Sequence, residues 1–341
     1  MPDSPTDLRI GVLGCGRIGR MHAELIADRV DGLTLGAVYD VFADAADATA
    51  ARSGARVATS PESLIEGDDV DAIAICSSTD THIDLLVAAA AAGKPVFIEK
   101  PLSLDLEQVD RGIAAVDAAG IAVQVGFNRR FDPSHRAVRR RVLDSDIGDV
   151  HLCRITSRDP APPPISYIEV SGGIFNDMTI HDFDMARFVT GSEVVDVFAH
   201  GAVLVDPAIG EAGDFDTVVV TMRHENGAIT TIDNSRRAVY GYDQRVEVFG
   251  SEGIAMSDNP LVTTTTFRDA TGGHQSVVPH FFLDRYIPSY LAEWAAFRDL
   301  VRDGGPSAVS MADGRAPLAL GIAALTSARE ARIVAVSEVA P

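Results

Sequence analysis

The sequence predicts an α/β protein of two domains, the first of which is built on a doubly wound parallel sheet. Its 341 residues are long for one hydrophobic core, which favours two domains. Over residues 8–125, short apolar strands alternate with segments of helical length, as in a parallel sheet covered by helices on both faces. A glycine-rich turn follows the first strand, at the edge of the sheet where such folds bind their ligands.

The first strand, residues 8–13, runs directly into Gly14-Cys15-Gly16-Arg17-Ile18-Gly19, which opens a helix expected over residues 17–30. In this context Gly14 permits a tight turn, Gly16 lets the backbone approach a pyrophosphate, and Gly19 lets helix and strand pack closely. The pyrophosphate would rest on the free amides of the helix start, beside Arg17 and Ile18. The motif therefore predicts a dinucleotide cofactor.

The second strand, residues 33–39, is closed by Asp40. This aspartate stands about 20 residues after the last glycine, where an acidic side chain accepts hydrogen bonds from the adenosine ribose 2′-OH. Its carboxylate would repel a 2′-phosphate, and residues 41–43 offer no arginine to bind one. The sequence thus favours NAD over NADP. Alternatively, Asp40 is only a turn or helix-cap residue, but this interpretation requires the glycine motif to have arisen by chance.

The alternation continues to residue 125. Helices are expected over residues 43–53, 61–67, 84–92 and 105–119, and strands over residues 55–57, 71–76, 95–98 and 121–125. Polar residues follow two of these strands and are predicted to contact the cofactor: Ser77, Ser78, Thr79, His82, Glu99 and Lys100. His82 is more simply explained as the first residue of a helix. Lys100 would ordinarily be a surface lysine, but its place at the cofactor edge favours a functional role.

A second candidate site lies in residues 171–185. A helix that begins near Asp177 would turn Asp177, His181 and Asp184 toward one face, while the interleaved residues are apolar. Two carboxylates and an imidazole on one face favour a cleft over open solvent, with a capped, acidic surface helix as the alternative. His181 and Asp182 also resemble a metal-binding pair, but no other cluster offers supporting ligands, so no metal is expected.

The composition narrows the class of protein. A net charge of −20 argues against nucleic-acid and anionic-membrane partners, and the arginines at 136 and 139–141 are most simply a solvated helix face. The three cysteines are scattered and form no CxxC motif, which excludes a disulfide framework and suits a reducing cytosol. The N-terminus shows no basic signal region, and apolar runs such as residues 85–92 are too short to span a bilayer. We therefore expect a soluble, cytoplasmic protein.

The chain contains three motifs in order: the glycine loop, Glu99-Lys100-Pro101, and Asp177 with His181. With these motifs it resembles the glucose-fructose oxidoreductase/inositol dehydrogenase/rhizopine catabolism family over nearly its whole length. The sequences GFNRRFD at 126–132, SRDP at 157–160 and YGYD at 240–243 look like those of its inositol 2-dehydrogenases. The resemblance implies a Rossmann NAD-binding domain over residues 7–126. It also implies a substrate-binding and oligomerisation α/β domain over residues 127–341, with an open, mostly antiparallel sheet that packs in homo-oligomers, often tetramers.

The second half of the sequence agrees with such a domain. Strands are expected over residues 150–158, 194–204, 217–223, 228–235 and 245–249, with a hairpin loop at 224–227 and helices over 289–303 and 312–334. Residues 160–164 contain four prolines and are expected to form an ordered extended loop near the cleft or a mobile flap.

The resemblance also implies roles for single residues. Lys100, Asp177 and His181 match the family's catalytic trio, in which the histidine takes the proton of the reacting hydroxyl while hydride passes to nicotinamide C4. An imidazole titrates near neutrality and suits this task, and a lysine can stabilise negative charge on the reacting oxygen. Asp177 would orient the imidazole or bind the substrate. Further candidates for binding a polyol are Asn128, Arg129, Asp159, Asp184, Tyr240 and Tyr242.

The function implied is NAD-dependent oxidation of a cyclic polyol, most specifically of myo-inositol to 2-keto-myo-inositol (scyllo-inosose). Some inositol dehydrogenases carry a methionine where Asn128 stands and a histidine in the motif that here begins at Ser157, and close relatives often have an arginine in place of Asn176. These departures leave scyllo- or chiro-inositol as alternatives. Another sugar or anhydrosugar is a further alternative. A non-catalytic NAD-binding regulator would keep the glycines and could lose the trio, so the presence of all three residues favours an enzyme.

Overall fold

The structure is a computed structural model, and it describes residues 7–340. It divides into two compact units: Met1–Asn128 with Tyr290–Ala316, and Arg129–Ser289 with Pro317–Pro341. The chain passes between the units inside two long helices, α11 (Phe282–Asp303) and α12 (Met311–Glu330).

Unit 1 contains a six-stranded sheet in the order β3-β2-β1-β4-β5-β6, with every pair of neighbours parallel. The order reverses between β1 and β4, the crevice where doubly wound folds bind ligands. The strands are β1 (Leu8–Leu13), β2 (Leu33–Tyr39), β3 (Arg56–Val57), β4 (Ala72–Ile75), β5 (Val96–Glu99) and β6 (Val123–Gly126). The predicted parallel, doubly wound sheet is confirmed.

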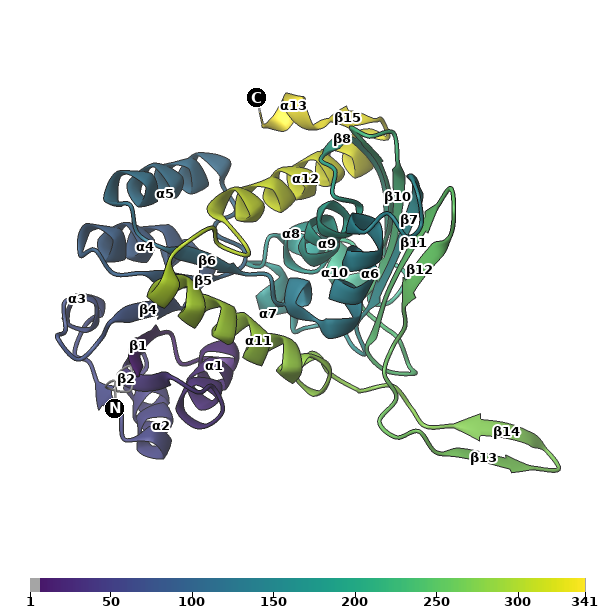
Figure 1. The fold of residues 1–341 in the computed structure, drawn as a ribbon. Helices are drawn as coiled ribbons and strands as arrows, with labels where there is room; N and C mark the ends of the chain where they lie inside the picture. The colour runs from purple at the N-terminus through teal and green to yellow at the C-terminus, as the bar shows by residue number, and fades with distance from the viewer. Residues whose placement is uncertain (1–6, 341) are drawn as a thin grey trace. The chain divides into compact units, whose positions relative to one another are not determined.

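Five helices and one 3₁₀ turn connect these strands (Figure 1): α1 (Arg17–Asp28), α2 (Ala43–Ser53), α3 (Pro61–Ile65), η1 (Thr79–Thr81), α4 (His82–Ala91) and α5 (Leu106–Ala119). All four residues of β4 are buried, as expected for a central parallel strand covered on both faces. Ile10, Val38, Ala74 and Phe97 from the sheet form one core with residues of α1 and with Trp294 of α11.

Unit 2 contains a seven-stranded sheet in the order β12-β11-β7-β10-β9-β8-β15, in which only β7 and β10 pair in parallel. Its strands are β7 (Val150–Arg158), β8 (Val194–Ala202), β9 (Thr217–His224), β10 (Ile229–Ser235), β11 (Asp243–Gly250), β12 (Ile254–Ser257) and β15 (Val334–Ala335). The predicted mostly antiparallel sheet is confirmed, although β12 and β15 were not predicted. Neither was the hairpin of β13 (Thr266–Asp269) and β14 (Gly272–Gln275), which extends away from this sheet (Figure 1).

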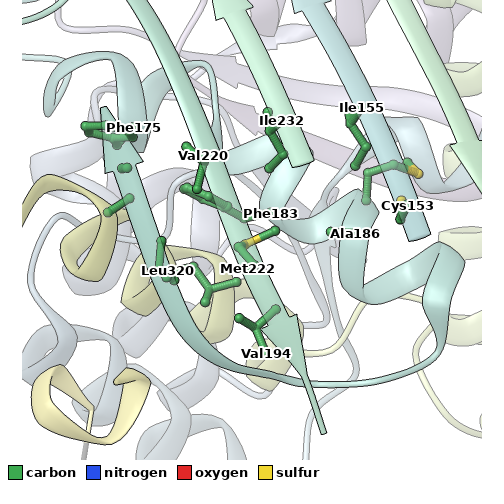
Figure 2. Packing of buried hydrophobic residues seen from close by; sticks show 14 of the residues in the cluster. Cys153, Ile155, Phe175, Phe183, Ala186, Val194, Val220, Met222, Ile232 and Leu320 are labelled. Atoms are coloured by element: carbon green, nitrogen blue, oxygen red, sulfur yellow. The ribbon is translucent and has the colours of Figure 1, made fainter. Parts of the chain in front are cut away.

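One face of this sheet is covered by helices. Val218, Val220 and Met222 of β9 alternate with more exposed residues and point into the core. Figure 2 shows such strand residues beside Phe183 and Ala186 of α9 and Leu320 of α12. The helices of this unit, besides the parts of α11 and α12, are α6 (Pro133–Leu143), α7 (Ile165–Ile168), α8 (Gly173–Asp177), α9 (Ile180–Thr190), α10 (Pro207–Glu211) and α13 (Val336–Val339), with the turn η2 (Asn128–Phe131) at the unit boundary.

The other face of the sheet carries exposed apolar side chains. They come from five strands: Leu152, Val219, Ile229, Phe249, Ile254 and Met256. We call this set the outer-face patch. No helix within residues 7–340 combines the length and the apolar character needed to cross a membrane.

Candidate functional site

The glycine loop after β1 has the geometry of a ligand cradle. Gly14 has a φ of +95°, and a Cβ there would lie 2.5 Å from the backbone nitrogen of Ser77. A Cβ on Gly19 would lie 1.8 Å from the carbonyl oxygen of Gly14, so both glycines are required by the fold itself. A Cβ on Gly16 would meet nothing within 4 Å. This glycine faces open space at the start of α1, beside Arg17 and Ile18, which fits close approach by a pyrophosphate.

Asp40 lies directly beyond β2 and is connected to this loop. Its Oδ2 accepts a hydrogen bond from the backbone nitrogen of Cys15 at 2.6 Å, and its Oδ1 accepts one from the nitrogen of Phe42 at 2.9 Å. Each carboxylate oxygen can accept a second hydrogen bond, so the position fits the predicted ribose contact. The sequence did not reveal that Asp40 also holds the glycine loop in place.

The residues after β4 differ in their exposure. Ser78 is exposed and Ser77 and Thr79 are half-buried, with Ser77 packed against Gly14. His82 is buried, and its ring nitrogens lie 2.9 Å from the carbonyl oxygen of Pro101 and 3.1 Å from that of Ser77. Burial lowers the pKa of His82, and the hydrogen bonds to the carbonyl oxygens of Ser77 and Pro101 oppose this shift. The ring lies between the loops that follow β4 and β5. This burial argues against the predicted cofactor contact for His82.

Lys100 follows β5 and is half-buried, with a cis peptide bond to Pro101. Glu99 is buried and points inward: its Oε1 lies 2.7 Å from Nε2 of His22, and its Oε2 accepts from the backbone nitrogen of Lys100 at 3.2 Å. Glu99 therefore contacts α1 and its own neighbour, which argues against the predicted cofactor contact.

The helix predicted to begin near Asp177 is wrong. Asp177 ends α8, whereas His181 is the second residue of α9, and Met178 and Thr179 separate the two helices. The hydroxyl of Thr179 lies 3.2 Å from the carbonyl oxygen of Ile174 and 2.6 Å from Oδ1 of Asn234. These contacts hold Thr179 as the residue preceding α9. Asp177 and His181 therefore belong to two successive helices and do not share one helical face.

Asp177 is held in place from two sides. The hydroxyl of Tyr167 donates to its Oδ1 at 2.9 Å, and Nη1 of Arg236 lies 3.2 Å from its Oδ2. The buried Arg236 also reaches Asp214 at 3.5 Å, and Asp214 accepts from the backbone nitrogen of Ile174 at the start of α8. Tyr167, Arg236 and Asp214 were not predicted from the sequence. The pair Arg236-Arg237 directly after a predicted strand is the one signal that could have indicated Arg236.

Asp159 follows β7 in the same unit. Burial and, second to it, the negative charge of Asp177 raise the pKa of Asp159 to about 6, and Arg236 opposes the shift. Such a carboxyl group can hold or release a proton near neutral pH. Asp159 therefore remains a candidate for hydrogen bonding to a substrate hydroxyl.

Two other predicted substrate contacts lie in a buried network around Asp182. Arg129 Nη1 lies 2.7 Å from Asp182 Oδ1, and Asn234 and Ser157 also hydrogen-bond to Asp182, at 2.8 and 2.6 Å. Arg129 Nη2 reaches the buried hydroxyl of Tyr242 at 3.4 Å. Because they are buried in this network, Arg129 and Tyr242 are poorly placed for the predicted substrate contacts. The ion pair with Arg129 also occupies Asp182, the aspartate of the His181-Asp182 pair considered above as metal ligands. Within residues 7–340, no group of three His, Cys, Asp or Glu residues is arranged to hold a metal ion.

The remaining candidates divide by exposure. Asp184 is fully buried, with Arg130 Nη2 2.6 Å from its Oδ1, which argues against a substrate contact. Tyr240 is exposed, donates to Asp243 at 2.6 Å, and lines an open pocket of unit 2 together with Arg158 and Arg237. Asn128 is buried, and its amide nitrogen has no hydrogen-bond partner within the described part of the chain, so it remains a candidate.

Comparisons with known proteins identify the family of the chain. Residues 8–127 match the model of an oxidoreductase family with an NAD-binding Rossmann fold, and residues 135–256 match the GFO/IDH/MocA C-terminal domain. The chain is 52% identical over 333 residues to a myo-inositol 2-dehydrogenase of Thermotoga maritima, covering 97% of this chain and 99% of the relative. It is 45% identical over 330 residues to an inositol 2-dehydrogenase of Rhizobium meliloti, covering 97% of this chain and 99% of the relative.

A solved structure extends the likeness to three dimensions. The crystal structure of a probable dehydrogenase from Thermotoga maritima superposes with a TM-score of 0.96 at 52% identity, covering 97% of this chain and all of that one (100%). Both halves of the chain match the same family, and the resemblance stated from the motifs is confirmed. The chain belongs to the GFO/IDH/MocA family and is an NAD-binding oxidoreductase of that family.

Proposed function

We propose that this protein is an inositol 2-dehydrogenase that oxidises myo-inositol to 2-keto-myo-inositol with NAD. The observation that carries the proposal is the match of nearly the whole chain, at 52% identity, to a myo-inositol 2-dehydrogenase. Lys100, Asp177 and His181 are all present, which favours the enzyme over a non-catalytic NAD-binding regulator.

The roles of the single residues are part of the proposal. The glycine loop and Asp40 bind NAD, which supplies the hydride acceptor at nicotinamide C4. His181 takes the proton of the hydroxyl whose carbon loses hydride, so that the C–OH group becomes a carbonyl. Asp177, held by Tyr167 and Arg236, orients His181 or a substrate hydroxyl, and Lys100 stabilises negative charge on the reacting oxygen. Asn128, Asp159 and Tyr240 are the proposed polyol contacts.

Two departures from other inositol dehydrogenases have structural explanations. Asn176 is buried, and a Cβ on Gly321 of α12 would lie 2.0 Å from its Oδ1, so Asn176 belongs to the packing between α8 and α12. Ser157, the first residue of the motif that departs from those enzymes, is fully buried and hydrogen-bonds to Asp182. Both residues act inside the protein, which weakens the case for a changed substrate and favours myo-inositol over scyllo- or chiro-inositol and over other sugars.

The first test is NADH formation across a panel of myo-, scyllo- and D-chiro-inositol, glucose and an anhydrosugar. We expect the highest kcat/KM with myo-inositol, and equal or better turnover of any other substrate would overturn the assignment. If the protein binds NADH in titrations but turns over none of these substrates, a non-catalytic NAD-binding regulator would be favoured.

We expect NAD to exceed NADP in kcat/KM by at least about tenfold, which requires about 1.4 kcal/mol of repulsion between Asp40 and a 2′-phosphate. Asp40→Asn is the matched variant, because an amide keeps an acceptor for the glycine loop but removes the charge. Asp40→Asn should reduce the ratio of kcat/KM with NAD to kcat/KM with NADP. Equal efficiency of the unaltered protein with NAD and NADP would contradict the ribose contact.

We also propose that the protein is a cytoplasmic homotetramer that associates through the outer-face patch. The three cysteines are buried and form no disulfide, which suits a reducing compartment. Exposed apolar side chains gathered on one sheet face are typical of an association surface.

Light scattering should give a mass of four 36.1 kDa chains at micromolar concentration. Leu152→Lys in the outer-face patch should lower this mass, because it places a charge inside the proposed interface. Leu143→Lys, an exposed leucine at the end of α6, is the matched control and should leave the mass unchanged. A monomeric unaltered protein would contradict the tetramer.

A further inference from the structure

A buried polar cluster lies behind Lys100, inside unit 1. Its members come from three elements that are distant in sequence: His22 from α1, Glu99 from β5, and Trp294 from α11. Trp294 Nε1 lies 2.8 Å from His22 Nδ1, and His22 Nε2 lies 2.7 Å from Glu99 Oε1. The chain of contacts ends at the backbone nitrogen of Lys100, which donates to Glu99 Oε2 at 3.2 Å. None of the proposed catalytic roles uses His22 or Trp294.

The direction of each hydrogen bond follows from the chemistry of its groups. An indole nitrogen can only donate, so Nδ1 of His22 must accept and carries no proton. Nε2 then carries the proton and donates to Glu99. Both oxygens of Glu99 therefore act as acceptors, as an ionised carboxylate does. One arrangement of protons satisfies the whole chain, so the orientation of Glu99 is determined.

Aromatic rings and a buried acid enclose this cluster. Phe97, Tyr290 and Trp294 lie with ring centroids 5.2, 5.5 and 5.5 Å from that of His22, each in an edge-to-face arrangement. Glu293, the residue before Trp294, is fully buried, and its carboxyl oxygens have no hydrogen-bond partner among residues 7–340. Burial, and then the charge of Glu99, raise the pKa of Glu293 well above its usual range. Burial thus favours the uncharged form of Glu293, while Glu99 accepts both hydrogen bonds of the cluster.

The Glu99 carboxylate is also closely packed against β6. A Cβ on Gly126, at the end of β6, would lie 3.0 Å from Glu99 Oε2. The Glu99 carboxylate is thus confined between α1 and β6 while it holds the first peptide nitrogen beyond β5. Because Lys100 directly follows this anchor, a shift of Glu99 would move the backbone from which the lysine side chain extends.

We propose that Trp294, His22 and Glu99 form a positioning relay that fixes the backbone of Lys100, which makes His22 and Trp294 positioning residues for the dehydrogenase reaction. The inference rests on the proposed function for its effect on catalysis. Its structural part, control of the Lys100 backbone by His22, can be measured without substrate.

Two amide substitutions of His22 separate the two halves of the relay. The amide of glutamine reaches the place of Nε2, so His22→Gln can still donate to Glu99. The amide of asparagine reaches only the place of Nδ1, so His22→Asn can still accept from Trp294 but loses Glu99. Both variants bury one uncharged amide in the same place, and each serves as the control for the other. Trp294 is the only tryptophan of the chain, so its fluorescence reports which variant keeps the indole contact.

We expect His22→Gln to keep a kcat close to that of the unaltered enzyme. His22→Asn should lower kcat by about 10- to 100-fold, since a misplacement of about 1 Å in a catalytic group costs this much. The dissociation constant of NADH should be the same in both variants, because the glycine loop and Asp40 are untouched. Equal kcat in the two variants would overturn the relay. A loss of thermal stability and activity to the same extent in both variants would also overturn it, because the two halves of the relay would then have the same effect.

Hydrogen exchange provides the readout that does not depend on the reaction. In His22→Asn the peptide that contains the Lys100 amide should exchange faster than in His22→Gln, as measured by mass spectrometry. Faster exchange without NADH formation on any substrate would retain the relay and reject the proposed function. Identical exchange in both variants would reject the relay, whatever the activity.

Discussion

His181→Ala is expected to lower kcat by about 10²- to 10⁴-fold, the contribution of a positioned general base. His181 lies in the first turn of α9 and is half-buried, so its ring can be removed without opening the core beneath Phe183. The measurement is the initial rate of NADH formation from myo-inositol at saturating substrate. KM should change much less than kcat, because the proton is transferred only in the reaction step.

The matched control for this prediction is His274→Ala, which removes the same ring from an exposed position on β14. It should leave kcat unchanged. Added imidazole should restore part of the activity of His181→Ala, because a free base can occupy the space that the ring leaves. A rate near that of the unaltered enzyme, with an intact fold by circular dichroism, would exclude His181 as the base.

The first unit could be predicted closely because each element carries its own local signal. The glycines of the loop, Asp40 beyond β2 and the fully apolar β4 are readable from short stretches of sequence. Those stretches do not show that Asp40 also holds the glycine loop, because its contact with the backbone nitrogen of Cys15 depends on how β1 and β2 pair. The relay at His22 was missed for the same reason, because Trp294 is 272 positions away from it.

The break between α8 and α9 shows why the second unit was harder. The apolar residues around Asp177 keep the same spacing whether the helix is continuous or interrupted. The interruption depends on Thr179, whose hydroxyl contacts Asn234, 55 positions away. A pattern of hydrophobic residues cannot report a hydrogen bond to a distant strand.

The polar residues of the candidate site could not be sorted into ligand contacts and internal contacts from the sequence, for a related reason. Polar side chains of a family motif suggest ligand contacts, but the sequence does not show whether a charge is buried and already paired. Arg129 and Asp184 are both buried and paired, with Asp182 and Arg130. The roles of Lys100, Asp177 and His181 remain predictions that the variants described above would test.

Arg129→Met is expected to destabilise the protein by about 3–5 kcal/mol, because it leaves the buried Asp182 without its counter-charge. For a unit of this size the apparent Tm should fall by on the order of 10 °C, measured by thermal unfolding at neutral pH. Adding Asp182→Asn should recover part of this loss, because it removes the unpaired charge and keeps an acceptor for Ser157 or Asn234. The double variant thus separates the cost of the charge from the cost of lost packing.

Arg141→Met on α6 is the control for this last prediction. Arg141 is exposed, and its Nη1 lies 2.6 Å from Oδ2 of Asp146. Such surface pairs contribute at most about 1 kcal/mol, so the Tm of this variant should hardly change. If Arg129→Met instead kept its Tm and raised the KM for myo-inositol, Arg129 would be the substrate contact that the sequence predicted. A large fall in Tm with partial recovery by Asp182→Asn would show that the arginine maintains the buried network beneath α9, so that it supports His181 through the fold.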